Sequence, residues 1–125
     1  MTPSGTMTAQ RLRSFCLGLA GAAEDTPFPQ APGLTVFKVE GKIFAFCALD
    51  ELPLTVSLKC DPEEALRLRE AYPSIVPGWH LNKRHWNSVT VGELPRRMVR
   101  ELIEDSYDLV VAGLPRAVRL RLDRP

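Results

Sequence analysis

Apolar residues recur at helical spacing in three stretches of the chain, which we expect to form helices. The first stretch starts after Thr8, a residue that suits a helix N-cap, and ends near Gly21. Its apolar stripe consists of Leu12, Phe15, Cys16 and Leu19. The second stretch starts at residues 61–64, where Asp, Pro and two Glu residues suit the first turn of a helix, and ends before Pro73. Its partly apolar side consists of Ala65, Leu66, Leu68 and Tyr72.

The third stretch gives the strongest helical pattern in the sequence. It starts near Pro95 and stops at Gly113-Leu114-Pro115. One stripe runs along it: Met98, Val99, Leu102, Ile103, Ser106, Leu109 and Val110. The tail that follows fits two patterns, because its apolar residues recur every four positions from Leu114, as in a helix, and every two positions from Val118, as in a strand. Both conformations of the tail therefore stay open at this point.

Strands are predicted where apolar and polar residues alternate or where Val, Ile and Phe gather. Residues 34–39 and 42–49 form a hairpin, because Glu40-Gly41 supplies a two-residue turn between them. Residues 54–60 alternate with period two and add a third antiparallel strand. A further hairpin runs from Ile75-Val76 to residues 86–91. By contrast, the prolines within residues 24–33 predict a loop.

The length and composition of the chain predict one domain. At 125 residues the chain can bury a single core, and we assign residues 1–7 to a flexible lead-in and residues 8–125 to the domain. No apolar run is long enough to span a bilayer and the N-terminus lacks a hydrophobic signal segment, so we expect a cytoplasmic protein without a membrane partner. Three cysteines in apolar patterns suit reduced core thiols better than disulfides or a zinc site: Cys16, Cys47 and Cys60.

Charge is nearly balanced over the chain but unevenly distributed. The formal net charge of +1 implies no general attraction to nucleic acid, although cations concentrate in the second half. Residues 77–89 hold both tryptophans and both histidines, and they place Lys83 and Arg84 between two predicted strands. This stretch is either a binding surface or a solvated turn, and the side chains of Trp79 and Trp86 are expected to be core anchors, as large aromatics usually are.

Three segments of the chain closely resemble the MmcQ/YjbR family. They are residues 58–62 (LKCDP), residues 77–89 (PGWHLNKRHWNSV) and residues 105–111 (DSYDLVV), with shorter matches at residues 25–28 and 41–45. The resemblance covers nearly the whole chain from the first helix onward. It implies a CyaY-like α+β fold, in which helices flank an antiparallel sheet in two layers. It also implies a role in DNA binding through wing-like hairpins, a double wing.

DNA binding is the function that the resemblance and the local charge favour. Lys83 and Arg84 at a loop tip would neutralise phosphates and release counterions, whereas nothing indicates readout of specific bases. The candidate nucleic-acid-binding residues lie on the hairpin and on the third helix: His80, Asn82, Lys83, Arg84, His85, Asn87, Arg96, Arg97 and Arg100. The alternative is a non-catalytic module that binds a protein or an anionic small molecule at the same hairpin and the adjoining aromatic pocket.

Metal and enzyme chemistry find less support in the sequence. No Cys, Asp or Glu near His80 and His85 completes a tetrahedral metal site, and we expect no cofactor. A catalytic arrangement would pair one of these histidines with Asp108, Ser106 or Tyr107. Yet no nucleophile elbow, phosphate-binding glycine loop or paired-carboxylate pattern accompanies these residues. We therefore predict no catalytic residues and a protein that is not an enzyme.

Overall fold

An antiparallel sheet and the helices packed against it make up the fold. The computed structural model describes residues 6–78 and 81–122. Within these residues the strands are β1 (Ala22–Asp25), β2 (Leu34–Val39), β3 (Lys42–Ala48), β4 (Thr55–Lys59), β5 (Ile75–Pro77) and β6 (Trp86–Thr90). The helices are α1 (Ala9–Leu17), α2 (Pro62–Ala71), α3 (Arg96–Ala112) and α4 (Arg116–Leu122), and a 3-10 turn, η1, covers Val91–Glu93.

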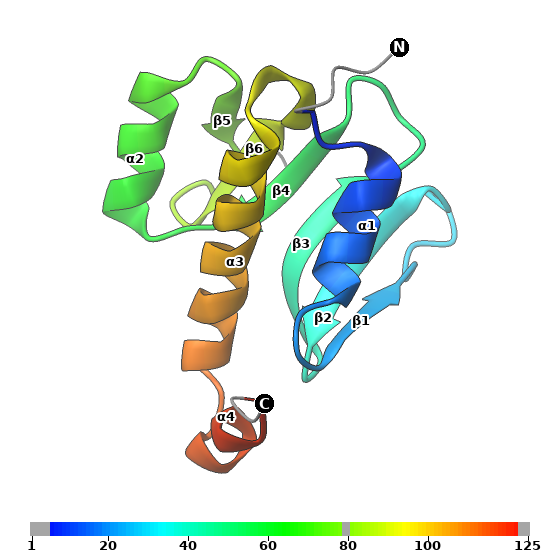
Figure 1. The fold of residues 1–125 in the computed structure, drawn as a ribbon, viewed down its shortest axis with the longest axis vertical. Coiled ribbons are helices and arrows are strands. Elements are labelled where there is room, and N and C mark those ends of the chain that lie inside the picture. Colours follow the sequence, from blue (N-terminus) through cyan, green and yellow to red (C-terminus); the bar gives the residue numbers. More distant parts are fainter. Residues whose placement is uncertain (1–5, 79–80, 123–125) are drawn as a thin grey trace.

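The strand order is β1-β2-β3-β4-β6-β5, and every neighbouring pair is antiparallel. α1 packs near β1, α2 near β5, and α3 crosses β3 and β4, as Figure 1 shows. The core lies between these helices and the sheet. The predicted two-layer α+β fold is confirmed. Among the residues described, none of the helices has the length and apolarity that a membrane span requires.

Two helices start at the capping residues that the sequence predicts. The side chain of Thr8 accepts a hydrogen bond from the N–H of Arg11 at 3.2 Å. The side chain of Asp61 accepts one from the N–H of Glu64 at 3.3 Å. Each cap provides an acceptor for an N–H group that has no partner inside its helix.

The region between α1 and β2 differs from the prediction. Residues 22–25 form an edge strand, although the sequence predicts a loop from Glu24 onward. Three of the four strand residues are exposed, so no apolar alternation marks β1, and only its ladder with β2 defines it. α1 ends at Leu17, before the predicted end at Gly21, whose positive φ of 72° leads the chain into β1. Met7, which belongs to the predicted lead-in, is buried in the core.

α3 supplies much of the helical side of the core. Its buried residues are Val99, Ile103, Ser106 and Val110. Two leucines of the predicted apolar stripes are exposed instead, Leu66 by 59% and Leu109 by 38%. The tail forms α4, so the helical alternative for this segment is the correct one.

A bulge in β3 creates a direct link between the sheet and α3. The β2–β3 register skips Phe44, which makes it the extra residue of a β-bulge. The buried hydroxyl of Ser106 donates to the carbonyl of Phe44 at 2.6 Å and accepts from the backbone N–H of Lys59 in β4 at 2.9 Å. One serine of α3 therefore provides partners for backbone groups of two strands.

Both hairpin connections lie at the same end of the sheet, where strands begin or finish. Because β3, β4 and β6 are antiparallel neighbours, the start of β3, the end of β4 and the start of β6 lie at that end. The β2–β3 turn has positive φ at Glu40 (49°) and Gly41 (75°), as a two-residue hairpin turn requires. α3 follows the other end of β6, so its first turn lies at the opposite end of the strands (Figure 1).

Candidate functional site

Arg69 of α2 holds the connection between β5 and β6. Its Nε donates to Oδ1 of Asn87 at 2.6 Å. Its Nη2 donates to the backbone carbonyls of Lys83 and, at 3.3 Å, of Trp86. The planar guanidinium carries several donors in a fixed geometry, which suits it to hold three acceptors at once. The backbone at Lys83 and Trp86 is thereby fixed to α2.

Further hydrogen bonds fix the tip of this connection, residues 82–84. The N–H of Arg84 donates to Oδ1 of Asn82 at 3.0 Å, which is the side-chain contact of an Asx-type turn. Just beyond the tip, the carbonyl of His85 accepts from the N–H of Cys60 at 2.7 Å. The tip is therefore tied both to itself and to the end of β4.

The base of the connection packs around Trp86. Its ring meets the ring of Phe46 nearly edge-on, with the centroids 5.6 Å apart. Gly78 donates to the carbonyl of Trp86 at 2.8 Å, and a Cβ at Gly78 would lie only 2.8 Å from the Cβ of Trp86. Trp86 is half-buried and packs against Phe46, and it does not belong to the buried core cluster, so it anchors the hairpin and is not the core anchor that the sequence predicts. Trp79 and His80 lie outside the described residues.

The predicted contact residues of the hairpin divide by exposure. Asn82, Lys83 and Arg84 are exposed, and His85 is half-buried. None of the ion pairs in the described part of the chain involves Lys83 or Arg84. Asn87 is only 2% exposed and faces the helices, so it is not available to a surface ligand such as DNA.

The arginines at the start of α3 form a second, separate basic surface. Arg97 pairs with Glu101 at 3.3 Å on an exposed face of the helix. Arg96 and Arg100 instead line a hollow of about 560 Å³ together with Arg11 of α1. This hollow and the tip lie at opposite ends of the strands of the sheet, because α3 begins beyond the far end of β6. The two groups of predicted cations therefore do not form one continuous patch.

The chain matches the family model described as YjbR over residues 17–109, which include the β5–β6 connection. The chain belongs to the YjbR family. The Escherichia coli O157:H7 protein YbdF is 43% identical over 97 residues, which cover 76% of this chain and 79% of YbdF. YjbR of Escherichia coli K12 is 35% identical over 114 residues, or 90% of this chain and 95% of YjbR. Both relatives carry the description uncharacterized, so family membership here brings no activity with it.

Solved structures of relatives have the same fold. The crystal structure of a Deinococcus radiodurans protein with a DUF419 domain superposes with a TM-score of 0.87 at 39% identity, covering all of this chain and 94% of that one. A Pseudomonas syringae protein gives a TM-score of 0.73 at 27% identity, covering 82% of this chain and 98% of that one. The family resemblance that the sequence motifs indicate is therefore confirmed.

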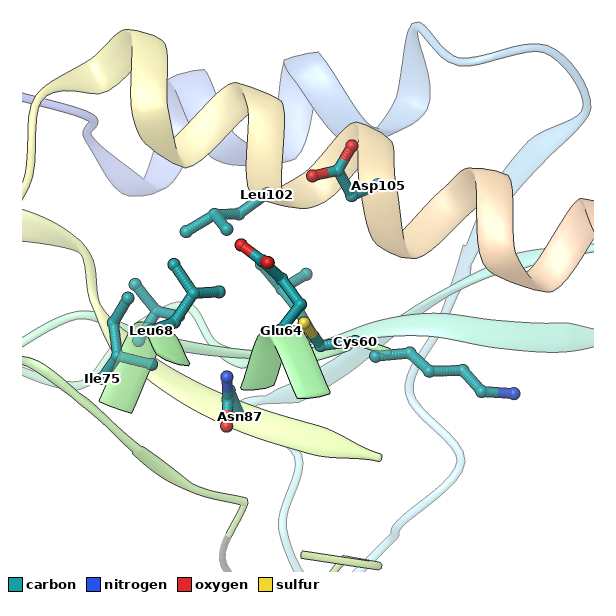
Figure 2. A pocket seen from close by; sticks show the side chains of 10 residues that line it. Cys60, Glu64, Leu68, Ile75, Asn87, Leu102 and Asp105 are labelled. Carbon is teal, nitrogen blue, oxygen red and sulfur yellow. The ribbon is translucent and has the colours of Figure 1, made fainter. Parts of the chain in front are cut away.

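This YjbR-family protein also has a groove between α2 and α3 that sequence analysis did not predict. The outer part of the groove has a volume of about 340 Å³, and its lining is Cys60, Asp61, Glu64, Asp105, Asp108, Leu109 and Ala112. An adjoining inner cavity, seen in Figure 2, leaves about 20 Å³ for a water-sized sphere. Its lining is Leu58, Lys59, Cys60, Glu64, Leu68, Ile75, Asn87, Val89, Leu102 and Asp105. All three segments that carry the family resemblance contribute to these walls.

Carboxylates set the electrostatics of the groove. Partial desolvation at the groove wall raises the pKa of Asp105 above its ordinary value, and the neighbouring negative charges of Asp108, Glu101 and Glu64 raise it further. Carboxylates that repel each other in this way favour a cation among them, because a positive charge relieves the repulsion.

Cys60 faces the groove as a protonated thiol. Burial raises its pKa to about 11, with further increases from the negative charges of Glu64, Asp61 and Asp105, while Arg69 acts in the opposite direction. A thiolate is the nucleophilic form of cysteine, and little of it exists near neutral pH at such a pKa. Cys60 therefore lacks the activation that a catalytic cysteine requires.

The hydroxyl groups considered as catalytic partners serve the fold instead. Ser106 is fully buried and bonds to the backbone of β3 and β4. The hydroxyl of Tyr107 donates to the carbonyl of Ala20 at 2.5 Å, and its ring meets that of Phe44 edge-on. Across the described residues, no group of three or more His, Cys, Asp or Glu side chains is placed to hold a metal ion.

Sequence analysis did not identify Arg69 as a residue that holds the hairpin. It lies among charged residues near the end of α2, where its position indicates only a solvated helix face. Its role depends on the β4–β6 register, which places Asn87 opposite Leu58 and thus on the helix side of the sheet. The available signal for the groove was the joint resemblance of residues 58–62 and 105–111, which meet there.

Proposed function

We propose that this protein binds the phosphate backbone of DNA weakly through the tip of the β5–β6 connection, with Lys83 and Arg84 as the contact residues. The supporting observation is that both cations are exposed and without a carboxylate partner in the described residues, while the backbone beneath them is held by Arg69, Asn82 and Cys60. A fixed backbone lowers the conformational entropy that binding removes. Exposed cations on such a backbone suit phosphate, which is recognised by charge.

The number of cations at this end of the sheet limits the strength of DNA binding. The β2–β3 turn lies at the same end of the sheet, and there Glu40 lies beside Lys42 and pairs with Arg121 at 3.8 Å, so a carboxylate accompanies the cations of this turn. Two phosphate contacts correspond to a slope of log K against log salt of about −1.8 on duplex DNA and about −1.4 on single strands. The expected binding is therefore weak, salt-dependent and free of base specificity.

The surroundings of the tip also restrict how DNA approaches it. The outer groove between α2 and α3 carries Asp61, Glu64, Asp105 and Asp108 near the end of β4, to which the tip is tied. These carboxylates would repel phosphate, so the DNA backbone is expected to contact the tip from the side away from the helices. Asn87 is buried and adds no hydrogen bond to this interface.

Fluorescence anisotropy with random duplex and single-stranded DNA across a salt series tests this proposal. The native protein is compared with Lys83→Ala/Arg84→Ala and with a matched control, Arg96→Ala/Arg100→Ala. Both double variants remove two positive charges, so they change the net charge equally. The tip variant is expected to lose affinity and to bring the salt slope close to zero, a change of about 1.8 on duplex DNA and about 1.4 on single strands, whereas the control retains both affinity and slope.

Three other outcomes would contradict the proposal. Equal losses in both variants would mean that only net charge attracts DNA to the protein. A loss confined to the Arg96→Ala/Arg100→Ala variant would move the interface to the hollow between α1 and α3. Absence of binding by the native protein at low salt would end the DNA proposal and leave a protein or an anionic small molecule as the partner of the hairpin.

A further inference from the structure

We propose that the groove between α2 and α3 binds a small protonated amine that also carries a neutral oxygen acceptor, such as an amino alcohol or the amide of an amino acid. This site uses different residues from the tip of the hairpin, and the proposal does not depend on DNA binding. Two features carry it: a buried amide donor at the deep end of the groove and a cluster of carboxylates at its mouth.

The buried donor is the side-chain amide of Asn87. Its Oδ1 accepts from Nε of Arg69 at 2.6 Å, and because arginine can only donate, this bond fixes which end of the amide carries the nitrogen. Figure 2 shows the nitrogen directed toward Glu64 and Leu68. Asn87 is 2% exposed, and its Nδ2 has no hydrogen-bond partner among the described residues. Buried donors are nearly always bonded, so the cavity suits a ligand with an acceptor atom.

The carboxylates at the mouth select a positive charge. The outer groove is lined by four of them: Asp61, Glu64, Asp105 and Asp108. Among the described residues, no Lys or Arg lines this outer part. Three cations lie close by, since Arg67 pairs with Glu64, Lys59 lines the inner cavity and Arg69 donates to Oδ1 of Asn87. The lining of the outer groove nevertheless remains negative in sum. A protonated amine is the organic group that offers several donors to such a cluster.

The shape of the site limits the size of the ligand. The inner cavity leaves about 20 Å³ for a water-sized sphere, which is close to the volume that one water requires. Its remaining walls are mostly apolar: Leu58, Leu68, Ile75, Val89 and Leu102. This space admits a hydroxyl or carbonyl oxygen without a second charge, while the outer groove of about 340 Å³ accepts the amine. The ligand therefore has its oxygen and its amine a few bonds apart.

A divalent metal ion fits these features less well than an amine. The described residues hold no cluster of three or more side chains with metal-ligand geometry. An amide N–H is a donor and cannot coordinate a cation, so a metal would leave Nδ2 of Asn87 without a partner. The same donor excludes a simple alkylamine, because an ammonium group has no acceptor to offer.

The test is a titration of nitrogen-15-labelled protein followed by NMR, which observes the side-chain amide of Asn87 directly. The probes are ethanolamine and glycinamide, and the matched probes are ethylamine, which lacks the oxygen, and acetamide, which lacks the charge. Ligands of this size are expected to bind with Kd values on the order of millimolar. Ethanolamine and glycinamide should shift the Asn87 amide signals more strongly and at lower concentration than either matched probe.

Three variants assign the effect to the groove. Asp105→Asn should weaken ethanolamine binding by about tenfold, because it removes a charged partner from the mouth. Asn87→Leu removes the donor and puts no polar group in its place, so it should abolish the preference for ethanolamine over ethylamine. Glu104→Gln, an exposed residue of α3 outside the groove lining, is the matched control and should change affinity by less than about twofold.

Several results would overturn the proposal. Equal binding of ethylamine and ethanolamine would show that the carboxylates attract any cation and that Asn87 takes no part. Equal binding of acetamide would show that charge is not recognised. No shift with any probe, in a protein whose spectrum shows it to be folded, would mean that the inner cavity holds at most a water molecule. Because Asp105 is exposed, Asp105→Asn is expected to fold even if Asn87→Leu does not.

Discussion

Replacing Ser106 with alanine tests how α3 is held against the sheet. Its hydroxyl donates to the carbonyl of Phe44, the extra residue of the β3 bulge, at 2.6 Å and accepts from the N–H of Lys59 at 2.9 Å. Ser106 is fully buried, so no solvent reaches it from outside. The Ser106→Ala variant leaves both backbone groups without this partner, while the helix itself is undisturbed.

The expected loss follows from the two backbone groups. A buried polar group without a partner costs about 1–3 kcal/mol, and alanine regains about 0.5 kcal/mol through its higher helix propensity. The free energy of unfolding should therefore fall by about 1.5–5.5 kcal/mol. For a chain of 125 residues, an unfolding entropy of about 2.1 cal/mol/K per residue converts this loss to a decrease in Tm of about 6–21 °C.

Urea unfolding followed by tryptophan fluorescence, together with thermal unfolding by circular dichroism, measures this loss. Ser14→Ala is the matched control, because Ser14 is an exposed serine within α1. The control should change stability by no more than about 0.5 kcal/mol. If Ser106→Ala proves as stable as Ser14→Ala, water or a neighbouring group must satisfy the two backbone groups, and the link between α3 and the bulge has been overestimated.

Two further predictions concern the hairpin anchor and the buried thiols. Arg69→Met should destabilise the protein by about 1–3 kcal/mol and speed hydrogen exchange at the tip, whereas Arg67→Met, two residues earlier on the exposed face of α2, should do neither. Burial raises the pKa of Cys16 and Cys47 from 9.0 to about 12, so the stability they contribute is present below about pH 9 and is lost as pH rises toward 12. Urea unfolding from about pH 8 to about pH 11 should show this decline, and it should be shallower in Cys16→Ala; equal slopes would contradict it.

The elements that could be predicted are those whose burial requires a recognisable pattern of apolar residues in the sequence. α3 buries one face, so its apolar residues repeat at helical spacing. β2 and β3 have buried residues on both faces, so Val, Ile and Phe gather in them on either side of the turn. β1 is an edge strand with three of its four residues exposed, and a sequence offers no period where nothing is buried. Leu66 and Leu109 show the converse, because an apolar residue on a helix is not obliged to face the core.

The candidate site was less predictable because it depends on contacts between distant segments. The exposure of Lys83 and Arg84 follows from their place in a turn, and sequence analysis identified them. Asn87 lies within the same motif, yet strand alternation turns it toward the helices. The separation of the tip from Arg96 and Arg100 follows from the topology of β6 and α3, which residue types do not reveal.

The tip and the groove are connected by one chain of hydrogen bonds. A ligand oxygen on Nδ2 of Asn87 would order the amide whose Oδ1 binds Arg69, and Arg69 in turn binds the carbonyl of Lys83 at the tip. Such networks reinforce each other in a buried setting. If an amine in the groove steadies the tip and thereby raises its affinity for DNA, DNA must raise the affinity for the amine by the same factor, because the coupling free energy is reciprocal. Arg69→Met removes the link, so any coupling that survived in that variant would have to act through the electrostatic field of the groove.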